Sequence, residues 1–214
     1  MKLIIFIHTC EAYEEKRAKL LEDSWALANM DIVFITDNPN SKLLNKIYVG
    51  SYKKGATYHP TSVKKMIDIW LTNYADYDYY LMIDDDSYLF VDKLKHFLSS
   101  LNSQDCLMIG DIFNWIKIDT GLWNPNKEWW IGGGPGIVFT KSCLEEFKRL
   151  YTINEIRISN HDVWLHDLYL KSNIIKRVHC PGFHQYPSMI KSTDDLISIH
   201  LNHDMSLLKN YPRI

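Results

Sequence analysis

Short apolar runs alternate with amphipathic segments along most of the chain. A continuous apolar run is typical of a strand buried on both faces, whereas apolar residues three or four positions apart indicate one face of a helix. These patterns predict strands within residues 2–8, 30–37, 77–83 and 105–112, a weaker strand within 44–51, and a strand after a glycine-rich turn within 131–140. They predict helices within residues 14–29, 60–75, 90–101, 141–151 and 160–172.

The alternation of strands and helices predicts an α/β fold with a largely parallel central sheet flanked by helices. Ligands of such folds bind beyond the carboxyl ends of the strands, and Asp37 and Asp84–Asp86 both follow predicted strands. The 214 residues fit one domain, without an internal repeat or a linker. The segment Phe113–Trp130 is aromatic and polar without a clear period, so we interpret it as a long functional loop.

Composition and charge narrow the possible partners. The formal net charge is −2, which gives no electrostatic reason to expect binding to nucleic acid or to an anionic membrane. No apolar run approaches the roughly 20 residues that span a bilayer, and the run within residues 1–8 is too short for a signal-peptide core. The cysteines are scattered without a Cys-x-x-Cys pair, so we expect free thiols, no zinc site and a cytoplasmic location.

The strongest chemical signal is the acidic triplet Asp84, Asp85 and Asp86, which directly follows an apolar strand. Adjacent carboxylates repel one another, and aspartate is a poor strand former, so this placement costs stability unless a cation offsets it. Hard oxygen ligands suit Mg²⁺ or Mn²⁺. In an extended chain Asp84 and Asp86 share one side and Asp85 takes the other. A solvated acidic turn is the alternative interpretation.

Three histidines near the end of the chain are candidates to complete a metal site: His184, His200 and His203. His200 follows the strand-like residues 196–199 and is therefore the preferred ligand. An imidazole with two carboxylates favours Mn²⁺ over Ca²⁺. For any single histidine, a surface or core position without a ligand is the alternative.

Two further segments carry candidate binding or catalytic groups. Residues 129–140 combine tryptophans, whose faces pack on sugars, with glycines that let backbone approach a ligand, although a tight turn explains them as well. Asp162 and Asp167 lie at the start of a predicted helix, where each is either a general base or a charge that compensates the helix dipole. Lys64 and Lys65 either pair with a phosphate or lie in solvent.

In this order, the segments resemble the fringe-like and core β1,3-glycosyltransferases, whose A-type (GT-A) fold is a Rossmann-like domain with an Asp-x-Asp metal motif. Residues 79–94 resemble the family's strand and Asp triplet, and 129–147 its Gly-Gly-x-Gly strand and helix. Residues 160–170 resemble the family's Glu-Asp-Val block, and residues 183–186 and 197–200 resemble its two C-terminal histidine motifs. Residues 8–25 resemble its N-terminal block. The resemblance implies one GT-A domain over 1–214, with a nucleotide-binding part of about 1–110 and a catalytic and acceptor part of about 111–214.

The resemblance also implies roles for the matched residues. Asp86 would bind the metal directly, and Asp84 would contact the donor ribose or a metal-bound water. His200 would be a further metal ligand, with His184 as the alternative, and Asp162 would be the catalytic base. The nucleotide and diphosphate would lie near Thr9, Arg17, Asp37, Lys65 and Asp85, and the sugar and acceptor side would be lined by Trp130, Gly133 and Gly134.

The implied reaction transfers a hexose or deoxyhexose from a UDP-sugar to a hydroxyl of a glycan or glycoconjugate, with inversion and with Mn²⁺ or Mg²⁺. The alternatives are a retaining mechanism, a metal-dependent phosphohydrolase, and a non-catalytic glycan-binding module built on Trp115, Trp123, Trp129 and Trp130. The chain departs from the family pattern because it lacks the usual membrane anchor and disulfide framework. It also has Asn160-His161 in place of the usual acidic residue before Asp162.

Overall fold

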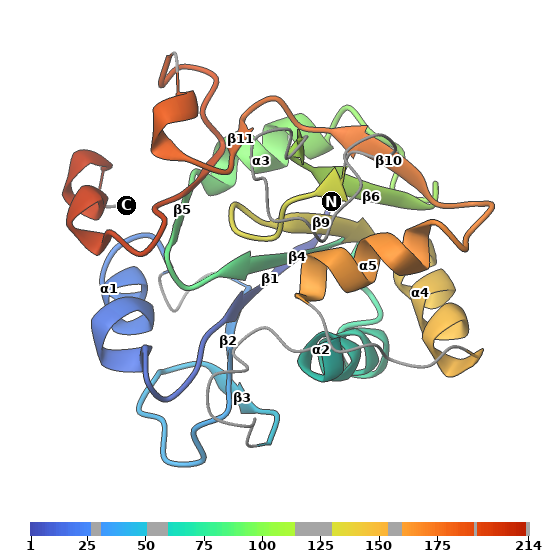
Figure 1. Ribbon diagram of the computed structural model, residues 1–214, viewed down its shortest axis with the longest axis horizontal. Helices are drawn as coiled ribbons and strands as arrows, with labels where there is room; N and C mark the ends of the chain where they lie inside the picture. Colours follow the sequence, from blue (N-terminus) through green and yellow to red (C-terminus); the bar gives the residue numbers. More distant parts are fainter. Residues whose placement is uncertain (27–30, 51–59, 114–129, 154–159, 191, 213–214) are drawn as a thin grey trace, which may run out of the picture.

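The computed structural model describes residues 1–26, 31–50, 60–113, 130–153, 160–190 and 192–212. Its central sheet has the strand order β10-β6-β9-β4-β1-β2-β3 (Figure 1). The strands are β1 (Leu3–His8), β2 (Ile32–Thr36), β3 (Lys46–Tyr48), β4 (Tyr79–Asp84), β6 (Leu107–Gly110), β9 (Ile137–Thr140) and β10 (Lys176–His179). β9 is antiparallel to both of its neighbours, and every other neighbouring pair is parallel, which confirms the predicted mostly parallel sheet.

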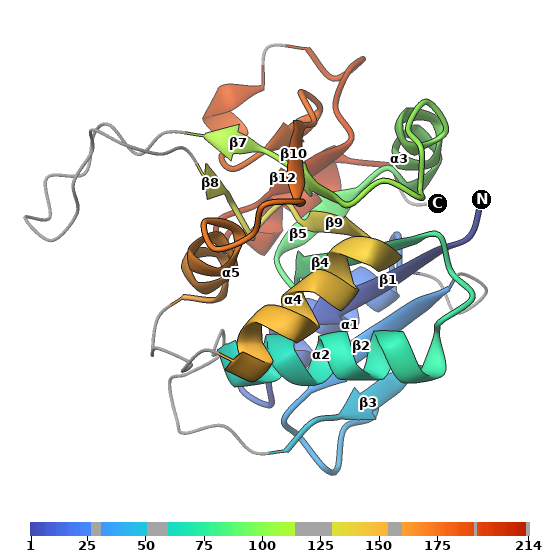
Figure 2. The ribbon, with the colours of Figure 1, turned by 90° about the vertical axis from the view of Figure 1, so that its right-hand side faces the viewer.

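Helices cover both faces of the central sheet. One face packs against α2 (Pro60–Asn73), α4 (Lys141–Ile153) and α5 (His161–Tyr169). The other face packs against α1 (Lys19–Glu22) and α3 (Val91–Leu98). Figure 2 shows α2 and α4 lying across one face of the sheet. The predicted α/β class is therefore confirmed.

The strand β1 shows why the apolar runs lack alternation. Leu3, Ile5 and Ile7 join the apolar core on the α1 and α3 side, whereas Ile4 and Phe6 join the core on the α2 side. Both sets are almost fully buried. Burying a large apolar side chain stabilises a fold by about 1.5–3 kcal/mol, so a strand covered on both faces favours apolar residues at every position.

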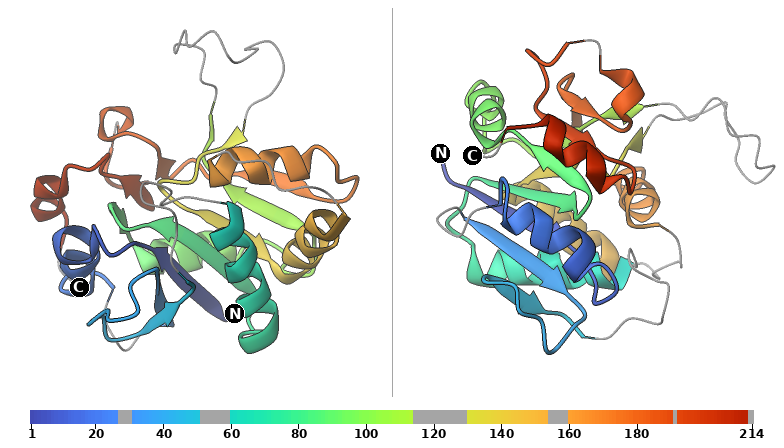
Figure 3. Two further views of the ribbon diagram at one scale, coloured as in Figure 1. Left: turned by 60° about the horizontal axis from the view of Figure 1, so that its bottom comes forward. Right: turned by 90° about the vertical axis from the view of Figure 1, so that its left-hand side faces the viewer.

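Two small sheets lie beyond the central one. The first has the order β11-β12-β5 and consists of β5 (Ser87–Leu89), β11 (Phe183–His184) and β12 (Ser198–His200). The second pairs β7 (Ile112–Phe113) with β8 (Trp130–Ile131). A final 3-10 helix, Met205–Asn210, lies beside α1 in both views of Figure 3. The chain therefore returns its C-terminal strands to the region that follows β4.

Several predicted elements differ from the observed ones. The predicted helix at 14–29 begins as a π-helical stretch, Glu14–Ala18, continues as α1 and stops at Glu22, while residues 27–30 lie outside the described residues. The predicted loop Phe113–Trp130 has paired strands at its two ends, and residues 114–129 lie outside the described residues.

The central sheet takes strands from both predicted parts of the chain, because β9 and β10 follow residue 110 and pair within it. The division near that residue stays a prediction. Among the described residues no helix combines the length and apolar character needed to cross a bilayer. The cytoplasmic location likewise stays a prediction.

Candidate active site

The carboxyl ends of β1, β2 and β4 meet at one edge of the central sheet. These strands pair in parallel, with His8 of β1 opposite both Ile35 of β2 and Asp84 of β4. Thr9, Asp37 and Asp85 directly follow the three strands in the sequence. This edge therefore collects polar and acidic groups at the position where open α/β sheets bind ligands.

A candidate cation site forms from Asp84, Asp86 and His200, whose ligand atoms all lie within 4.8 Å of one another. Strand pairing builds this cluster. The chain turns at Asp85 and Asp86 and continues as β5, which pairs antiparallel with β12 so that Ser87 lies opposite His200. All three clustered side chains are buried, and their oxygen and imidazole donors suit Mn²⁺ or Mg²⁺.

Asp85 lies apart from this cluster and binds protein groups instead. The Thr9 hydroxyl donates a 2.7 Å hydrogen bond to Asp85 Oδ2, and Arg17 Nη1 lies 3.3 Å from Asp85 Oδ1. Burial raises the pKa of Asp85 to about 7, although the Thr9 hydrogen bond and the Arg17 charge act in the opposite direction. The predicted separation of Asp85 from Asp84 and Asp86 is therefore confirmed.

Asp86 is surrounded by donor groups. Arg17 Nη1 lies 3.3 Å from Asp86 Oδ2, and the backbone N–H of His203 donates to the same oxygen at 3.0 Å. His203 Nδ1 is 2.7 Å from Oδ2, and His200 Nε2 is 3.1 Å from Oδ1. Burial alone would raise the pKa of Asp86, but His200, Arg17 and His203 outweigh it and hold this pKa at about 2.

Asp84 has a different environment. It is buried, and its Oδ1 has no hydrogen-bond partner among the described residues. Burial, followed by the charges of Asp86, Asp85 and Asp162, raises the pKa of Asp84 well above its ordinary value, against the charge of Arg17. A buried carboxylate without a partner is costly, and a divalent cation beside Asp84 and Asp86 would offset that cost. The residues present therefore fit a bound cation.

Gly133 and Gly134 pass between two histidine rings. A Cβ added to Gly133 would lie 2.2 Å from His161 Nε2, and one added to Gly134 would lie 2.6 Å from His200 Nδ1. The hydroxyl of Ser87 donates to the Gly134 carbonyl at 2.7 Å. Glycine is therefore required at both positions by close approach, and this turn connects α5 with the metal cluster.

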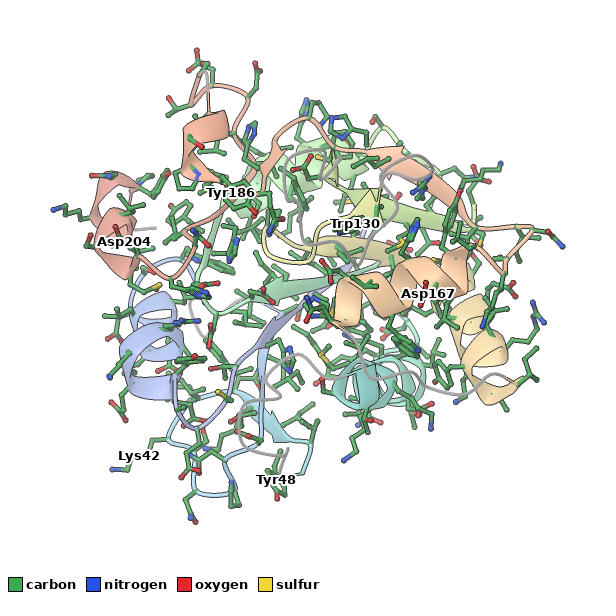
Figure 4. The ribbon with its side chains drawn as sticks, viewed as in Figure 1. Lys42, Tyr48, Trp130, Asp167, Tyr186 and Asp204 are labelled. Carbon is green, nitrogen blue, oxygen red and sulfur yellow. The ribbon has the colours of Figure 1, made fainter. Side chains whose placement is uncertain are left out.

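Asp162 lies in the first turn of α5, as predicted. It is half-buried, and its Oδ1 accepts a 2.8 Å hydrogen bond from the Val163 backbone. Its charge contributes to the raised pKa of Asp84, so the two carboxyl groups belong to one electrostatic site. Asp167 lies in the last turn of α5, not at its start, which corrects its predicted placement (Figure 4).

Asp37, Lys65 and Trp130 are the remaining residues that were predicted to lie near the sugar donor or the acceptor. The backbone N–H of Glu11 donates to Asp37 Oδ1 at 2.8 Å, directly after β2. Lys65 Nζ donates to the carbonyl of Val49, directly after β3. Trp130 is buried at the start of β8 (Figure 4). The structure thus brings Thr9 and Arg17 onto Asp85, while Asp37 and Lys65 contact backbone groups.

His184 lies outside the cluster although its strand neighbours β12. It is opposite Ile199 in the pairing of β11 with β12, whereas the following residue, Gln185, places Nε2 3.3 Å from His200 Nδ1. His203 reaches Asp86 because Asn202 and His203 both have positive φ angles, of 51° and 70°. Asn and His adopt positive φ angles more often than most residues, but the sequence alone does not show that this turn brings His203 onto Asp86.

Two further histidines, His8 and His161, are buried at the same edge, with ring centroids 6.4 Å apart. Burial and the charge of His161 lower the pKa of His8 to about 3, and burial lowers the pKa of His161. Sequence reasoning did not single them out as site residues. The available signals were the position of His8 at the end of a strand and the replacement of an acidic residue by His161.

A family model described as Fringe-like matches residues 1–201, so the chain belongs to the Fringe-like family. Chondroitin sulfate synthase 3 of Mus musculus and that of Homo sapiens are each 32% identical over 108 residues. Each match covers 42% of this chain and only 11% of the relative.

A solved structure of the galactosyltransferase LgtC, in complex with donor and acceptor sugar analogs, is also similar to the chain. It has 11% sequence identity and a TM-score of 0.48, and the match covers 92% of this chain and 86% of that one. The family match confirms the predicted class, a glycosyltransferase domain of the Fringe-like family.

Proposed function

We propose that the chain transfers a hexose or deoxyhexose from a UDP-sugar to a hydroxyl of a glycan or glycoconjugate, with a bound divalent cation and with inversion. The observation that carries this proposal is the cluster of Asp84, Asp86 and His200 at the ligand-binding edge of the sheet. Asp162, in the first turn of α5, belongs electrostatically to the same site. The Fringe-like family supports the class of reaction.

The cation in this proposal is Mn²⁺ or Mg²⁺, held by Asp86 and His200 with Asp84 as a direct ligand or as the partner of a metal-bound water. When bound, it supplies positive charge to the donor diphosphate and offsets the negative charge that develops on the leaving UDP. Asp86 suits this role because its low pKa keeps it ionised. The orphaned Oδ1 of Asp84 supports the same assignment.

The donor nucleotide is assigned to the edge formed by Thr9, Arg17 and Asp37. Lys65 is assigned to the diphosphate, and Asp85 contacts Thr9 and Arg17. Arg17 carries a positive charge between Asp85 and Asp86, so it reduces the repulsion between these carboxylates and an incoming diphosphate. Asp85 holds Thr9 and Arg17 in place through its two oxygens. We therefore assign Asp85 a positioning role.

The acceptor is activated by Asp162 as the general base. The hydroxyl oxygen attacks the anomeric carbon from the face opposite UDP, a new C–O bond forms, and the bond from carbon to the phosphate oxygen breaks with its electrons leaving on UDP. The hydroxyl proton moves to the Asp162 carboxylate. Trp130, Gly133 and Gly134 line the sugar and acceptor side in this proposal, and the two glycines lie against the rings of His161 and His200.

The test is UDP release from a panel of UDP-sugars, measured with and without Mn²⁺ and with and without a mixture of glycan acceptors. The proposal predicts release that needs both Mn²⁺ and an acceptor and that is lost in Asp86→Asn. Asp105→Asn, an exposed carboxylate before β6 that belongs to no assigned site, is the matched control and should leave release unchanged. Hydrolysis of simple phosphate esters without any sugar acceptor would instead identify a phosphohydrolase.

A further inference from the structure

A cavity of about 840 Å³ lies beside β11 and α3. This volume is in the range of small-molecule sites. Its lining includes His184 of β11, whereas the next residue, Gln185, contacts the metal-cluster residue His200. β11 therefore lies between the cavity and the candidate active site. None of the roles assigned above uses this cavity.

Asp111 supplies the cavity with a buried polar group that lacks a partner. It directly follows β6, is 4% exposed, and its Oδ2 has no hydrogen-bond partner among the described residues. His179 Nδ1 lies 4.0 Å from Asp111 Oδ1, but this nitrogen accepts a hydrogen bond from the Ile112 backbone at 3.2 Å. It therefore has no proton to donate to Asp111. A ligand that donates an O–H or N–H group to Oδ2 would remove the cost of leaving it unpaired.

The remaining lining indicates what kind of ligand this is. Phe97, Pro181 and Phe183 provide apolar surface, which packs against the C–H faces of sugar rings. Among the described lining residues, the carboxylates of Asp92, Asp111, Asp194 and Asp195 outnumber the single ammonium, that of Lys93. The lining also contains His96, His179 and His184. The ammonium of Lys93 already donates to the carbonyls of Thr193 and Asp194. Anionic sugars such as uronates or sulfated units are therefore disfavoured here.

The cavity also connects through the backbone to the turn beside the metal cluster. The Asp111 carbonyl accepts a 3.1 Å hydrogen bond from the Gly132 N–H, and Gly133 and Gly134 follow directly. A ligand that occupies the cavity would thus be near the turn to which the acceptor side is assigned.

We propose that this cavity is an acceptor subsite for an uncharged saccharide, which donates a hydrogen bond to Asp111 Oδ2 and packs against Phe97 and Phe183. The subsite rests on the proposed transferase function, because it holds an acceptor unit other than the one that reacts. The carboxylates of the lining disfavour an acidic saccharide of the same size. The cavity beside β11 and α3 would then contribute to acceptor specificity, in addition to the residues around the metal cluster.

Saturation-transfer NMR without UDP or metal tests this subsite directly. The probes are lactose, cellobiose and N,N′-diacetylchitobiose at millimolar concentration, with cellobiouronic acid, an acidic disaccharide, as the charged control of matched size. We expect at least one neutral probe to bind and cellobiouronic acid not to bind. Asp111→Ala and Phe97→Ala should each weaken binding about tenfold or more, while the exposed control Asp105→Ala should not. Phe97 is only partly buried on α3, so its variant remains informative if Asp111→Ala fails to fold.

The outcomes separate the two proposals. If no neutral probe binds, or if both variants bind as the wild type does, the subsite is wrong even where UDP binds in a metal-dependent way. If a neutral probe binds through Asp111 and Phe97 but UDP does not bind with metal, the proposed transferase function fails, and the assignment of the cavity to an acceptor fails with it. In an active enzyme, Phe97→Ala should raise the KM for a neutral acceptor while kcat stays near its wild-type value.

Discussion

Gly134 lies directly against the ring of His200, so that a Cβ at this position would come within 2.6 Å of both Cγ and Nδ1. The same glycine accepts a hydrogen bond from Ser87 Oγ, and Ser87 lies opposite His200 in the pairing of β5 with β12. Gly134 therefore sets the position of the histidine relative to Asp84 and Asp86. The glycine-rich turn has a structural role in the metal cluster, besides any contact with sugar.

The first prediction concerns this contact. Gly134→Ala should displace the His200 ring and weaken the binding of Mn²⁺ together with UDP, because the added methyl group has no space. Isothermal titration of UDP in the presence of Mn²⁺ would measure the loss, and circular dichroism would check the fold. Unchanged affinity in a folded Gly134→Ala variant would show that the turn does not position His200.

The second prediction compares two neighbouring carboxylates without metal. The pKa of Asp84 is higher in the folded protein than its ordinary value of 3.8, which we take for the unfolded chain. As pH rises above 3.8, ionisation of Asp84 therefore destabilises the fold. Asp84→Asn should consequently raise the melting temperature at pH 7.5. Asp86 has a pKa near 2 and stabilises the fold at the same pH, so Asp86→Asn should lower the melting temperature. Each kcal/mol corresponds to about 2–4 °C for a chain of this size. Shifts of the same sign in EDTA would contradict the assigned environments.

The third prediction separates chemistry from donor binding. Asp162→Asn keeps the shape of the side chain but removes its proton affinity, so transfer should fall by roughly 10²–10⁴-fold while UDP affinity stays nearly unchanged. The matched control is Asp167→Asn, which changes an aspartate of the same helix in its last turn. Near-normal transfer by Asp162→Asn would remove Asp162 as the base and would favour a retaining mechanism.

The fourth prediction concerns pH and His8. Its folded pKa is about 3 against an ordinary value of 6.5, so between these values the unfolded state binds a proton that the folded state does not. Stability should therefore fall as pH drops from 6.5 towards 3, by up to about 1.4 kcal/mol per pH unit from this residue. His8→Gln should have a shallower decline, measured as the urea-unfolding free energy at a series of pH values. Equal slopes in both proteins would contradict a buried, neutral His8.

The sequence predicted the layers of this fold because strands such as β1 and β4 are buried on both faces and leave continuous apolar runs. It also predicted the separation of Asp85 from Asp84 and Asp86, although the reason differs, because Asp85 and Asp86 lie in a turn after β4 and not in an extended strand. It did not predict the antiparallel direction of β9. That direction depends on pairing with β4 and β6, which lie far away in the sequence.

The contacts of the histidines likewise depend on segments that lie far apart in the sequence, so local patterns in the sequence do not determine them. His200 was preferred from its place after a strand-like segment, but its meeting with Asp86 depends on the pairing of β12 with β5. The contact between His203 and Asp86 depends on two consecutive positive φ angles. Asn and His adopt such angles more often than most residues, but residue type does not show which side chain the turn will meet. The burial of His161 against Gly133 is likewise set by the packing of α5 against the turn.

If Asp84, Asp86 and His200 hold a cation that in turn holds the donor diphosphate, the thermal stability of the protein with UDP will depend on that cation. UDP should stabilise the protein only when Mn²⁺ or Mg²⁺ is present, by about 2.7 kcal/mol at a UDP concentration 100 times its dissociation constant. The same stabilisation should be absent in EDTA and in His200→Ala, while His184→Ala should retain it. Equal stabilisation by UDP with Mn²⁺ and with EDTA would show that the cluster does not hold the diphosphate through a cation.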